Sequence, residues 1–436
     1  MNVETFIMQN SGKKTGIWVV GAWGGVAATV AVGLLAMAQR KVKPWGLTTE
    51  LPQFTDVPMP EWSDFVLGGC EIRQSSYAQA TEELVRQNAL NASVVASVAD
   101  DLKELDGNIR PSFLQHSGAV VENMADWMGE VSGTTARDMI TAMQADMDCF
   151  KDDHDLDHLI VVNLMSTEPF CTYFQWERLG ELPTEDLQQR QAQWQHWDAM
   201  ASLLDLPVEE CPLPASTLYA IATLELGYDF LNFTPSLGAT PPALHELARS
   251  MNARTMGNDG KTGETLMKSV LAPMFAHRNL EVMSWVGHNI LGNRDGAALD
   301  DPLNKATKLN SKSHLLSQIL GYDPEMLVSI EYIKSLGDWK TAWDHIHFRG
   351  FLGTPMTLQF TWQGCDSLLA APLVLDLVRL TQLARMRGFT GKMDFLSCFF
   401  KSPVGIEEQN FERQFAMLEA WLKEVPEQQQ PARPAK

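Results

Sequence analysis

The residues between Met256 and Ser313 combine the side chains that a site for a polar ligand needs. Glycines, amides, single carboxylates and spaced lysines are crowded into this part of the chain. They occur in the runs Gly260-Lys-Thr-Gly-Glu-Thr265, Asn289-Ile-Leu-Gly-Asn-Arg-Asp-Gly296 and Lys308-Leu-Asn-Ser-Lys312. A packed core does not need such a mixture. We therefore expect a pocket for a polar, anionic small molecule here.

A strand, a glycine turn and a helix at the N-terminal end are typical of a dinucleotide-binding fold. Ile17 to Val20 is a short β-type run, Gly21 to Gly25 is a glycine-rich turn, and Val26 to Ala38 is a helical run of small residues. Glycines let the backbone approach a pyrophosphate, and the helix N-terminus offers free N–H groups. A strict G-x-G-x-x-G would need glycine where Trp23 and Val26 stand.

Alone, this N-terminal pattern leaves three interpretations open. Lys13 and Lys14 precede a run without charged residues from Thr15 to Gln39, which also resembles a membrane segment. Nucleotide binding, a buried helix and a membrane span therefore all fit the first 40 residues.

The following strands favour a parallel sheet with a ligand at its carboxyl edge. Ser63 to Ile72 is an apolar strand whose Glu71 is placed to accept hydrogen bonds from a cofactor hydroxyl. Leu159 to Asn163 leads into Ser166 and Thr167 at another strand end. Further strands are expected over 230–236, 326–334 and 356–362, and helices over 80–105, 135–150, 184–204, 216–226, 241–251, 366–387 and 411–423.

The bulk composition excludes some classes of partner and compartment. With 436 residues, 45% hydrophobic and 20% charged, the chain is globular, and its formal charge of -20 argues against nucleic acid as a partner. The six cysteines are scattered without a Cys-x-x-Cys pair, which favours reduced thiols and a cytoplasmic location. His154-Asp-Leu-Asp-His158 could tempt a metal assignment, but we interpret it as the polar approach to a strand, and no metal site is predicted.

Six blocks in a fixed order resemble the myo-inositol-1-phosphate synthase family, also called inositol-3-phosphate synthase. The family has an Asp-x-Lys-Ser-Gly-Gln-Thr-like segment where Gly260 to Thr265 stands, and an Asn-His-Leu-Gly-Asn-Asn-Asp-Gly segment where Asn289 to Gly296 stands. The resemblance covers roughly residues 16–404. Departures are Trp23, Val26, Glu71, Thr262 and Arg294. The other blocks are Lys308-x-x-Ser-Lys312-Ser, Gly337-Asp-Trp-Lys340, Cys365-Asp-Ser-Leu-Leu-Ala-x-Pro372 and Phe400-Lys-Ser-Pro403.

The resemblance implies an α/β fold in which a Rossmann-type NAD-binding domain is interrupted by an α+β domain. It places the NAD-binding domain at 1–255 and an inserted catalytic and oligomerisation domain at 256–365. The segment 366–436 would then return to the NAD-binding domain. The assembly implied is a homotetramer, and we expect the Gln- and Pro-rich tail from Glu424 to be disordered.

The reaction implied converts D-glucose 6-phosphate to 1D-myo-inositol 3-phosphate with NAD that is regenerated in each turnover. Oxidation at C5 requires a proton acceptor, for which we predict Lys308, with Asp338 or Asp366 orienting a lysine. Clustered lysines lower one another's pKa. Enolisation next to the C5 ketone and the aldol closure of C6 onto C1 both develop an oxyanion that an ammonium group stabilises. The predicted catalytic residues are Lys308, Lys312, Lys340 and Lys401.

The remaining site residues follow from these blocks, from the N-terminal glycine turn and from the strand ends described above. Thr262, Lys340 and the N–H groups near Asn293 are expected to hold the phosphate. Asp259 and Asp295 are expected near the nicotinamide or a monovalent or divalent cation, whose requirement stays open. The predicted substrate residues are Thr262, Asn289, Asn293, Lys308, Lys312, Lys340 and Lys401. The predicted cofactor residues are Gly21, Trp23, Gly24, Gly25, Val26, Glu71, Ser166, Thr167, Asp259, Thr262, Asn293, Asp295, Asp338 and Asp366.

Two other hypotheses remain. The chain could be a different NAD-dependent oxidoreductase acting on a polar phosphorylated substrate, although the four lysines favour an aldol oxyanion. It could also be a non-catalytic protein that binds NAD or a sugar phosphate, or one anchored to a membrane through residues 17–38.

Overall fold

The computed structural model describes residues 14–175, 183–293, 296 and 315–424. Its largest element is a seven-stranded sheet with the order β11-β6-β5-β4-β1-β2-β3, in which each neighbouring pair is parallel. The Rossmann-type α/β arrangement predicted from the sequence is confirmed. The strands are β1 (Lys14–Val20), β2 (Phe65–Glu71), β3 (Ile109–Pro111), β4 (Leu156–Asn163), β5 (Asp229–Asn232), β6 (Arg254–Gly257) and β11 (Gly391–Lys392).

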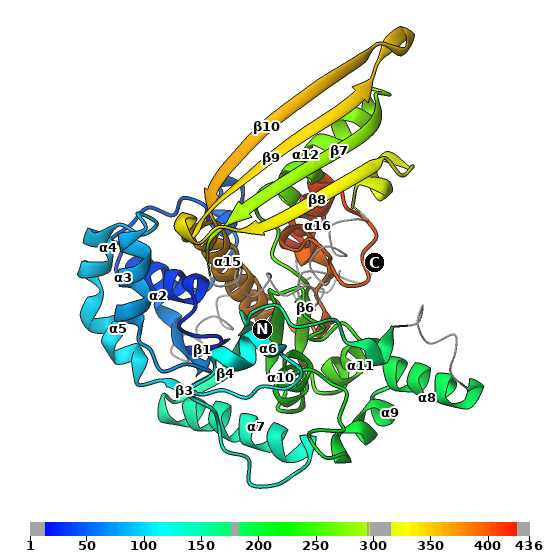
Figure 1. Ribbon diagram of the computed structural model, residues 1–436. Coiled ribbons are helices and arrows are strands. Elements are labelled where there is room, and N and C mark those ends of the chain that lie inside the picture. Colours follow the sequence, from blue (N-terminus) through cyan, green and yellow to red (C-terminus); the bar gives the residue numbers. More distant parts are fainter. Residues whose placement is uncertain (1–13, 176–182, 294–295, 297–314, 425–436) are drawn as a thin grey trace, which may run out of the picture.

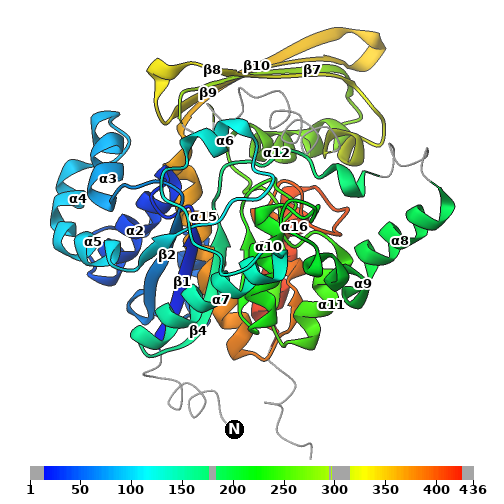
Figure 2. The same ribbon diagram turned by 60° about the horizontal axis from the view of Figure 1, so that its bottom comes forward.

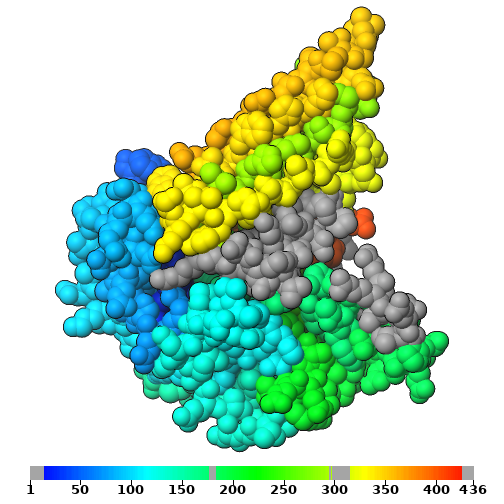
Figure 3. All heavy atoms as spheres, viewed as in Figure 1, coloured from blue at the N-terminus to red at the C-terminus, as the bar shows by residue number. Residues whose placement is uncertain are grey.

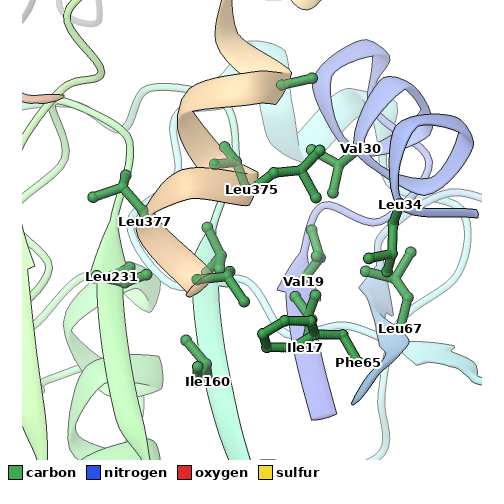
Figure 4. Close-up of a cluster of buried hydrophobic side chains, with 14 of the residues drawn as sticks. Ile17, Val19, Val30, Leu34, Phe65, Leu67, Ile160, Leu231, Leu375 and Leu377 are labelled. Carbon is green, nitrogen blue, oxygen red and sulfur yellow. The ribbon is translucent and has the colours of Figure 1, made fainter. Parts of the chain in front are cut away.

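One face of this sheet is covered by helices from opposite ends of the chain. α15 (Asp366–Met386) packs against α2 (Gly25–Ala38), and both lie over β1, β2 and β4. Figure 4 shows Leu375 of α15 beside Val30 of α2, above Val19 and Ile17. Also on this side are α3 (Tyr77–Arg86), α4 (Ala92–Ser97), α5 (Ala99–Asp106), the 3-10 turns η1 (Thr48–Glu50), η2 (Pro52–Phe54), η3 (Trp62–Asp64) and η9 (Asp394–Phe399), and α16 (Phe411–Lys423).

The other face has its own apolar core. It includes Trp18, Phe150 and Phe230, each of which is buried. Helices cover this face, and Figure 2 shows them on the side of the sheet away from α15. They are α7 (Ala136–Asp153), α9 (Trp197–Ala201), α10 (Ala215–Glu225) and α11 (Pro242–Ser250), with α6 (Ala119–Met124), α8 (Thr184–Gln195), η4 (Thr172–Phe174) and η6 (Ser202–Asp205) at the periphery.

A second sheet lies to one side of the first and packs on α12 (Gly263–His277). Its order is β10-β9-β7-β8, with β7 and β8 parallel and the other pairs antiparallel. Trp285, Ile346 and Phe275 form the core between this sheet and α12, and the sheet projects from the body like a wing (Figures 1 and 3). The strands are β7 (Glu281–Leu291), β8 (Glu325–Tyr332), β9 (Trp339–Arg349) and β10 (Pro355–Cys365), with η7 (Lys334–Leu336) and η8 (Phe351–Gly353) in the connections.

Several elements differ from the sequence prediction. The single helix expected over 80–105 is three helices, α3, α4 and α5. The first break occurs where Asn88 has a positive φ and Asn91 caps the N-terminus of α4. The helix expected over 184–204 is broken at His196, whose backbone is extended. β7 and β9 were not predicted as strands. β7 pairs with β8 and β9, which lie far along the chain, whereas β9 also forms a hairpin with the following β10. The domain limits and the disordered tail stay predictions, and residues 425–436 lie outside the described ones.

The membrane interpretation of residues 17–38 is wrong, because a turn separates β1 from α2 and both are buried in the fold. Among the described residues, α15 alone is long and apolar enough to cross a membrane, and 72% of its most apolar window is buried inside the protein. His158 lies within β4, where its Nε2 is 2.8 Å from Asp229 Oδ2, rather than in the approach to the strand.

Candidate active site

The turn between β1 and α2 forms one wall of a large pocket at the carboxyl edge of the parallel sheet. Gly21 has a φ of +93°, which favours glycine. Gly24 is the N-cap of α2 and has no side chain to cap the helix. The first-turn N–H groups are therefore left for an anion. A Cβ added to Gly25 would lie 2.6 Å from Ser367 Oγ. The turn therefore fits the pyrophosphate of a dinucleotide, and its residues Gly21, Trp23, Gly24, Gly25 and Val26 all line the pocket.

Trp23 occupies a position where a strict glycine motif has no side chain. Its indole Nε1 donates to Asp106 Oδ1 at 2.9 Å, and its ring stacks on Trp127 with centroids 5.5 Å apart. Burial raises the pKa of the Asp106 carboxyl, although the Tyr77 backbone N–H and Trp23 oppose this. The indole is therefore fixed by its partners while its backbone remains part of the turn.

Glu71 ends β2 beside this turn and is buried. Its Oε2 accepts from Trp23 N at 3.1 Å and from Arg73 at 3.1 Å, and its Oε1 accepts from Ile72 N at 3.0 Å. These bonds orient a carboxylate at the strand end, where such an acid accepts hydrogen bonds from cofactor hydroxyls. Arg73 also lines the pocket, and no feature of its sequence position marked it.

Ser166 and Thr167 follow β4 and also line the pocket, as does Glu168. Glu168 is buried, and its side chain contacts the first turn of α10. Its Oε1 accepts from Ser216 N at 2.9 Å and its Oε2 accepts from Ser216 Oγ. Burial raises the pKa of Glu168 to about 7, although its hydrogen bonds from Ser216 and Ser236 oppose this. Glu168 thus anchors the loop that carries the two predicted residues.

Asp259 and Lys401 meet across two loops that are distant in the sequence. Lys401 Nζ lies 2.8 Å from Asp259 Oδ1, and Lys401 N donates to Asp259 O at 2.6 Å. The neighbouring Gly260 pairs with Phe400 as an isolated β-bridge. Both charged residues line the pocket, so the structure delivers an ammonium and a carboxylate together to its wall.

Asp338 joins the second sheet to the start of α15. Its Oδ2 accepts from Cys365 Sγ at 2.6 Å and from Ser367 N at 2.9 Å, and its Oδ1 accepts from Ser367 Oγ at 2.8 Å. Asp366 N donates to the Asp338 carbonyl at 3.1 Å. Burial raises the pKa of Asp338, although the hydrogen bonds from Cys365 and Ser367 oppose this. Asp338 and Asp366 both line the pocket, next to Gly25.

Thr262 and Lys340 line the pocket on the side of α12 and β9. Thr262 precedes α12 without a side-chain hydrogen bond to it, so its hydroxyl and the first-turn N–H groups are placed to bind an anion. Among the described residues, the Lys340 side chain has no hydrogen-bond or ion-pair partner. A partly buried ammonium of this kind suits an incoming anion.

Asn293 lines the pocket, with its Nδ2 3.5 Å from Asp338 Oδ1. Asn289, by contrast, is buried in β7 behind the wall, where its Nδ2 donates to Glu264 Oε2 at 2.6 Å and to the Ser329 carbonyl at 3.3 Å. The structure therefore does not place Asn289 to touch a ligand, because its amide is used to hold Glu264. The predicted residues Lys308, Lys312 and Asp295 lie outside the described residues.

Some pocket residues were missed by the sequence reasoning. Glu264, Thr265 and Ser367 stand inside the quoted blocks, so their positions were a signal. Gln87 was not signalled, yet its Oε1 accepts from Asp338 N at 2.7 Å.

A family model described as myo-inositol-1-phosphate synthase matches residues 15–423. The chain belongs to this family. The matched model is an NAD-binding one, so NAD is the dinucleotide that the glycine turn and Glu71 fit. The resemblance inferred from the six blocks is confirmed.

Relatives with established names support the same assignment. The inositol-3-phosphate synthase 1 of Bacteroides thetaiotaomicron is 31% identical over 423 residues, covering 90% of each chain. The human inositol-3-phosphate synthase 1 is 30% identical over 398 residues, covering 87% of this chain and 65% of the human one. The crystal structure of inositol-3-phosphate synthase from Caenorhabditis elegans has a TM-score of 0.80 at 24% identity, covering 94% of this chain and 85% of that one. That last likeness concerns the fold.

Proposed function

We propose that this chain is an inositol-3-phosphate synthase that converts D-glucose 6-phosphate into 1D-myo-inositol 3-phosphate. The observation that carries the proposal is a single pocket lined by the dinucleotide turn and by Thr262, Lys340 and Lys401. Cofactor and sugar phosphate can thus be held against one another. The glycine turn and Glu71 would hold NAD, which would supply the hydride acceptor for oxidation at C5 and, as NADH, return the hydride after ring closure, with no net consumption.

The sugar phosphate is proposed to bind at the Thr262 side of the pocket. The Thr262 hydroxyl and the first-turn N–H groups of α12 donate to the phosphate, and the Lys340 ammonium adds a charge-assisted hydrogen bond. This orientation leaves the carbon chain between the phosphate donors and the glycine turn, where C5 can face the cofactor.

The lysines are proposed to handle protons and oxyanions. Lys401, held by Asp259, is placed to stabilise the oxygen that becomes negative during enolisation or closure of C6 onto C1. Lys308 remains our proposal for the proton acceptor at C5, with Lys312 as a second ammonium. For Lys308→Ala we propose loss of turnover with retained NAD binding.

The competing function is an ordinary NAD-dependent oxidoreductase acting on a phosphorylated substrate. The test is incubation of the protein with glucose 6-phosphate and NAD, with detection of both inositol phosphate and NADH. We expect inositol phosphate without net NADH. Steady NADH formation without inositol phosphate would establish the dehydrogenase instead.

We propose a homotetramer built through the outer face of the second sheet. This face exposes Leu327, Ile290 and Trp343, and Phe351 and Leu352 protrude at the β9–β10 tip with 88% and 87% of their surface accessible. Figure 3 shows the tip of the second sheet projecting beyond the body. Such apolar exposure is typical of an interface between copies, and light scattering of the purified chain measures the assembly.

The location and the cation requirement are also proposals. The six cysteines are all free thiols, which supports a reducing, cytoplasmic location that cell fractionation tests. A cation beside Asp259 would have to compete with the Lys401 ammonium. We therefore propose that the lysines, rather than a divalent cation, provide the positive charge, and assays after dialysis against a chelator test this.

A further inference from the structure

An arginine lies beside Glu71 in the part of the pocket that follows β2. Arg73 and Glu71 stand two positions apart in the sequence, and both line the pocket. Arg73 Nη2 donates to Glu71 Oε2 at 3.1 Å, and the two side chains are 19% and 4% exposed. An adenosine ribose held by Glu71 therefore lies next to a guanidinium, although the ribose of NAD has no negative group for that guanidinium to bind.

The hydrogen bonds of Glu71 leave it able to bind one more donor. Its Oε2 accepts from Trp23 N and from Arg73, whereas its Oε1 accepts from Ile72 N alone among the described residues. A carboxylate oxygen accepts about two hydrogen bonds, so Oε1 has room for a ribose hydroxyl. A phosphate at the same position would bring acceptor oxygens and a like charge, which this carboxylate repels.

Arg73 has unused binding capacity. A guanidinium has about five N–H donors, and within the described parts of the chain the Arg73 side chain makes a single hydrogen bond, to Glu71. A planar guanidinium binds phosphate through two parallel hydrogen bonds. In Rossmann-type folds an arginine near this strand end can accommodate the 2′-phosphate of NADP. Arg73 thus has the chemistry to bind NADP, and its ion pair with Glu71 withholds it.

We propose that Arg73 is a latent binding residue for the 2′-phosphate of NADP, and that Glu71 makes the pocket specific for NAD by neutralising this arginine. With Glu71 charged, a 2′-phosphate meets a carboxylate and a guanidinium whose charge is already compensated. Without the charge of Glu71, the same phosphate meets an uncompensated guanidinium. Specificity is a difference between two affinities, achieved here by a repulsive group placed against the wrong ligand. The inference rests on NAD as the cofactor and not on the reaction proposed above.

The test compares Glu71→Gln, Arg73→Met and the double variant by isothermal titration calorimetry with NAD and with NADP. We expect E71Q to raise the affinity for NADP by about 10- to 150-fold, the effect of one charge-assisted hydrogen bond, while its affinity for NAD falls. R73M should bind NAD with an affinity close to that of the wild type and should still reject NADP. E71Q/R73M should lose the gain in NADP affinity, and E71Q/R73K should keep part of it.

A merely structural ion pair gives a different pattern, because breaking it then weakens the binding of NAD and NADP alike. Unchanged or weaker NADP binding in E71Q, or a gain that persists in E71Q/R73M, would overturn the proposal. If E71Q fails to fold, Glu71→Ser replaces it in the same comparison. Glu83 also lines the pocket and stays unchanged in every variant.

The matched control is the Arg137–Glu225 pair, whose Nη1 and Oε2 atoms lie 2.6 Å apart and which joins α7 to α10 on the far face of the sheet. E225Q removes the same kind of charge from the partner of an arginine, and it should leave the affinities for NAD and NADP unchanged. If the wild type binds NAD but gives no inositol phosphate, the proposed function fails, while the calorimetric comparison still tests the role of Arg73.

Discussion

Lys401 reaches the pocket because a loop 142 residues away in sequence provides its partner Asp259. The ion pair is almost buried, with side chains 10% and 6% exposed, so the ammonium is oriented rather than solvated. An oriented charge aimed at a developing oxyanion needs little rearrangement during the reaction. The same contact ties the C-terminal loop to the loop that follows β6 of the large sheet.

Replacing Lys401 with methionine should mainly reduce the chemical step. We expect kcat to fall by on the order of 100- to 1000-fold, the usual effect of removing one oxyanion donor. NAD affinity, measured by calorimetry, should change little because the glycine turn and Glu71 remain. The control is Lys423→Met, at the exposed end of α16. A K401M variant with kcat near that of K423M would remove Lys401 from the catalytic residues.

At the scale of elements, what the sequence could predict depends on how local the signal is. The β1–turn–α2 unit was predictable because its strand, glycines and helix are consecutive. β7 was missed because its partners β8 and β9 lie far along the chain. β9 was missed although β10 follows it in a hairpin. Asn289 was placed in the substrate site by its block, yet its register on β7 turns it toward Glu264. The contacts Asp259–Lys401 and Asp338–Ser367 depend on tertiary packing, which the order of motifs indicates only through a family.

The close packing of α2 on α15 predicts a sensitive position at Gly25. In Gly25→Ala the new Cβ would lie 2.6 Å from Ser367 Oγ, which must move and disturb its hydrogen bonds to Asp338. We expect NAD affinity to fall by roughly tenfold or more, since a loss of about 1.4 kcal/mol of binding free energy lowers affinity tenfold. Quenching of tryptophan fluorescence by NAD can report this, because Trp23 and Trp127 lie beside the turn.

Gly33→Ala is the matched control on the same helix. Its added Cβ would meet only Leu375 Cδ1 at 3.3 Å, a flexible side-chain end, and alanine favours helix. NAD affinity should therefore stay unchanged in G33A. Equal affinities for NAD in G25A and G33A would contradict the role given to the contact with Ser367.

At the scale of the whole molecule, a buried lysine links the pocket loop to the C-terminal helix. Lys261 is 2% exposed, its Nζ donates to Gln414 Oε1 of α16, and its N–H donates to the Phe399 carbonyl at 2.7 Å. Burial lowers the pKa of Lys261 from 10.5 to about 8, although Cys398 opposes this. The folded protein thus holds this ammonium less readily than the unfolded chain does.

This difference predicts how the stability of the protein changes with pH. Below about pH 8 both states carry the proton, and the native state bears the burial penalty. Between about 8 and 10.5 the native state releases its proton while the unfolded chain retains it, so the free energy of unfolding rises with pH. Lys261→Met lacks this titration.

Relative to K261M, the wild type should therefore gain about 3 kcal/mol in its free energy of unfolding across that window, as measured by urea denaturation at several pH values. The exposed control K423M should keep a constant difference from the wild type, and a constant difference for K261M as well would mean that Gln414 keeps the buried ammonium charged throughout.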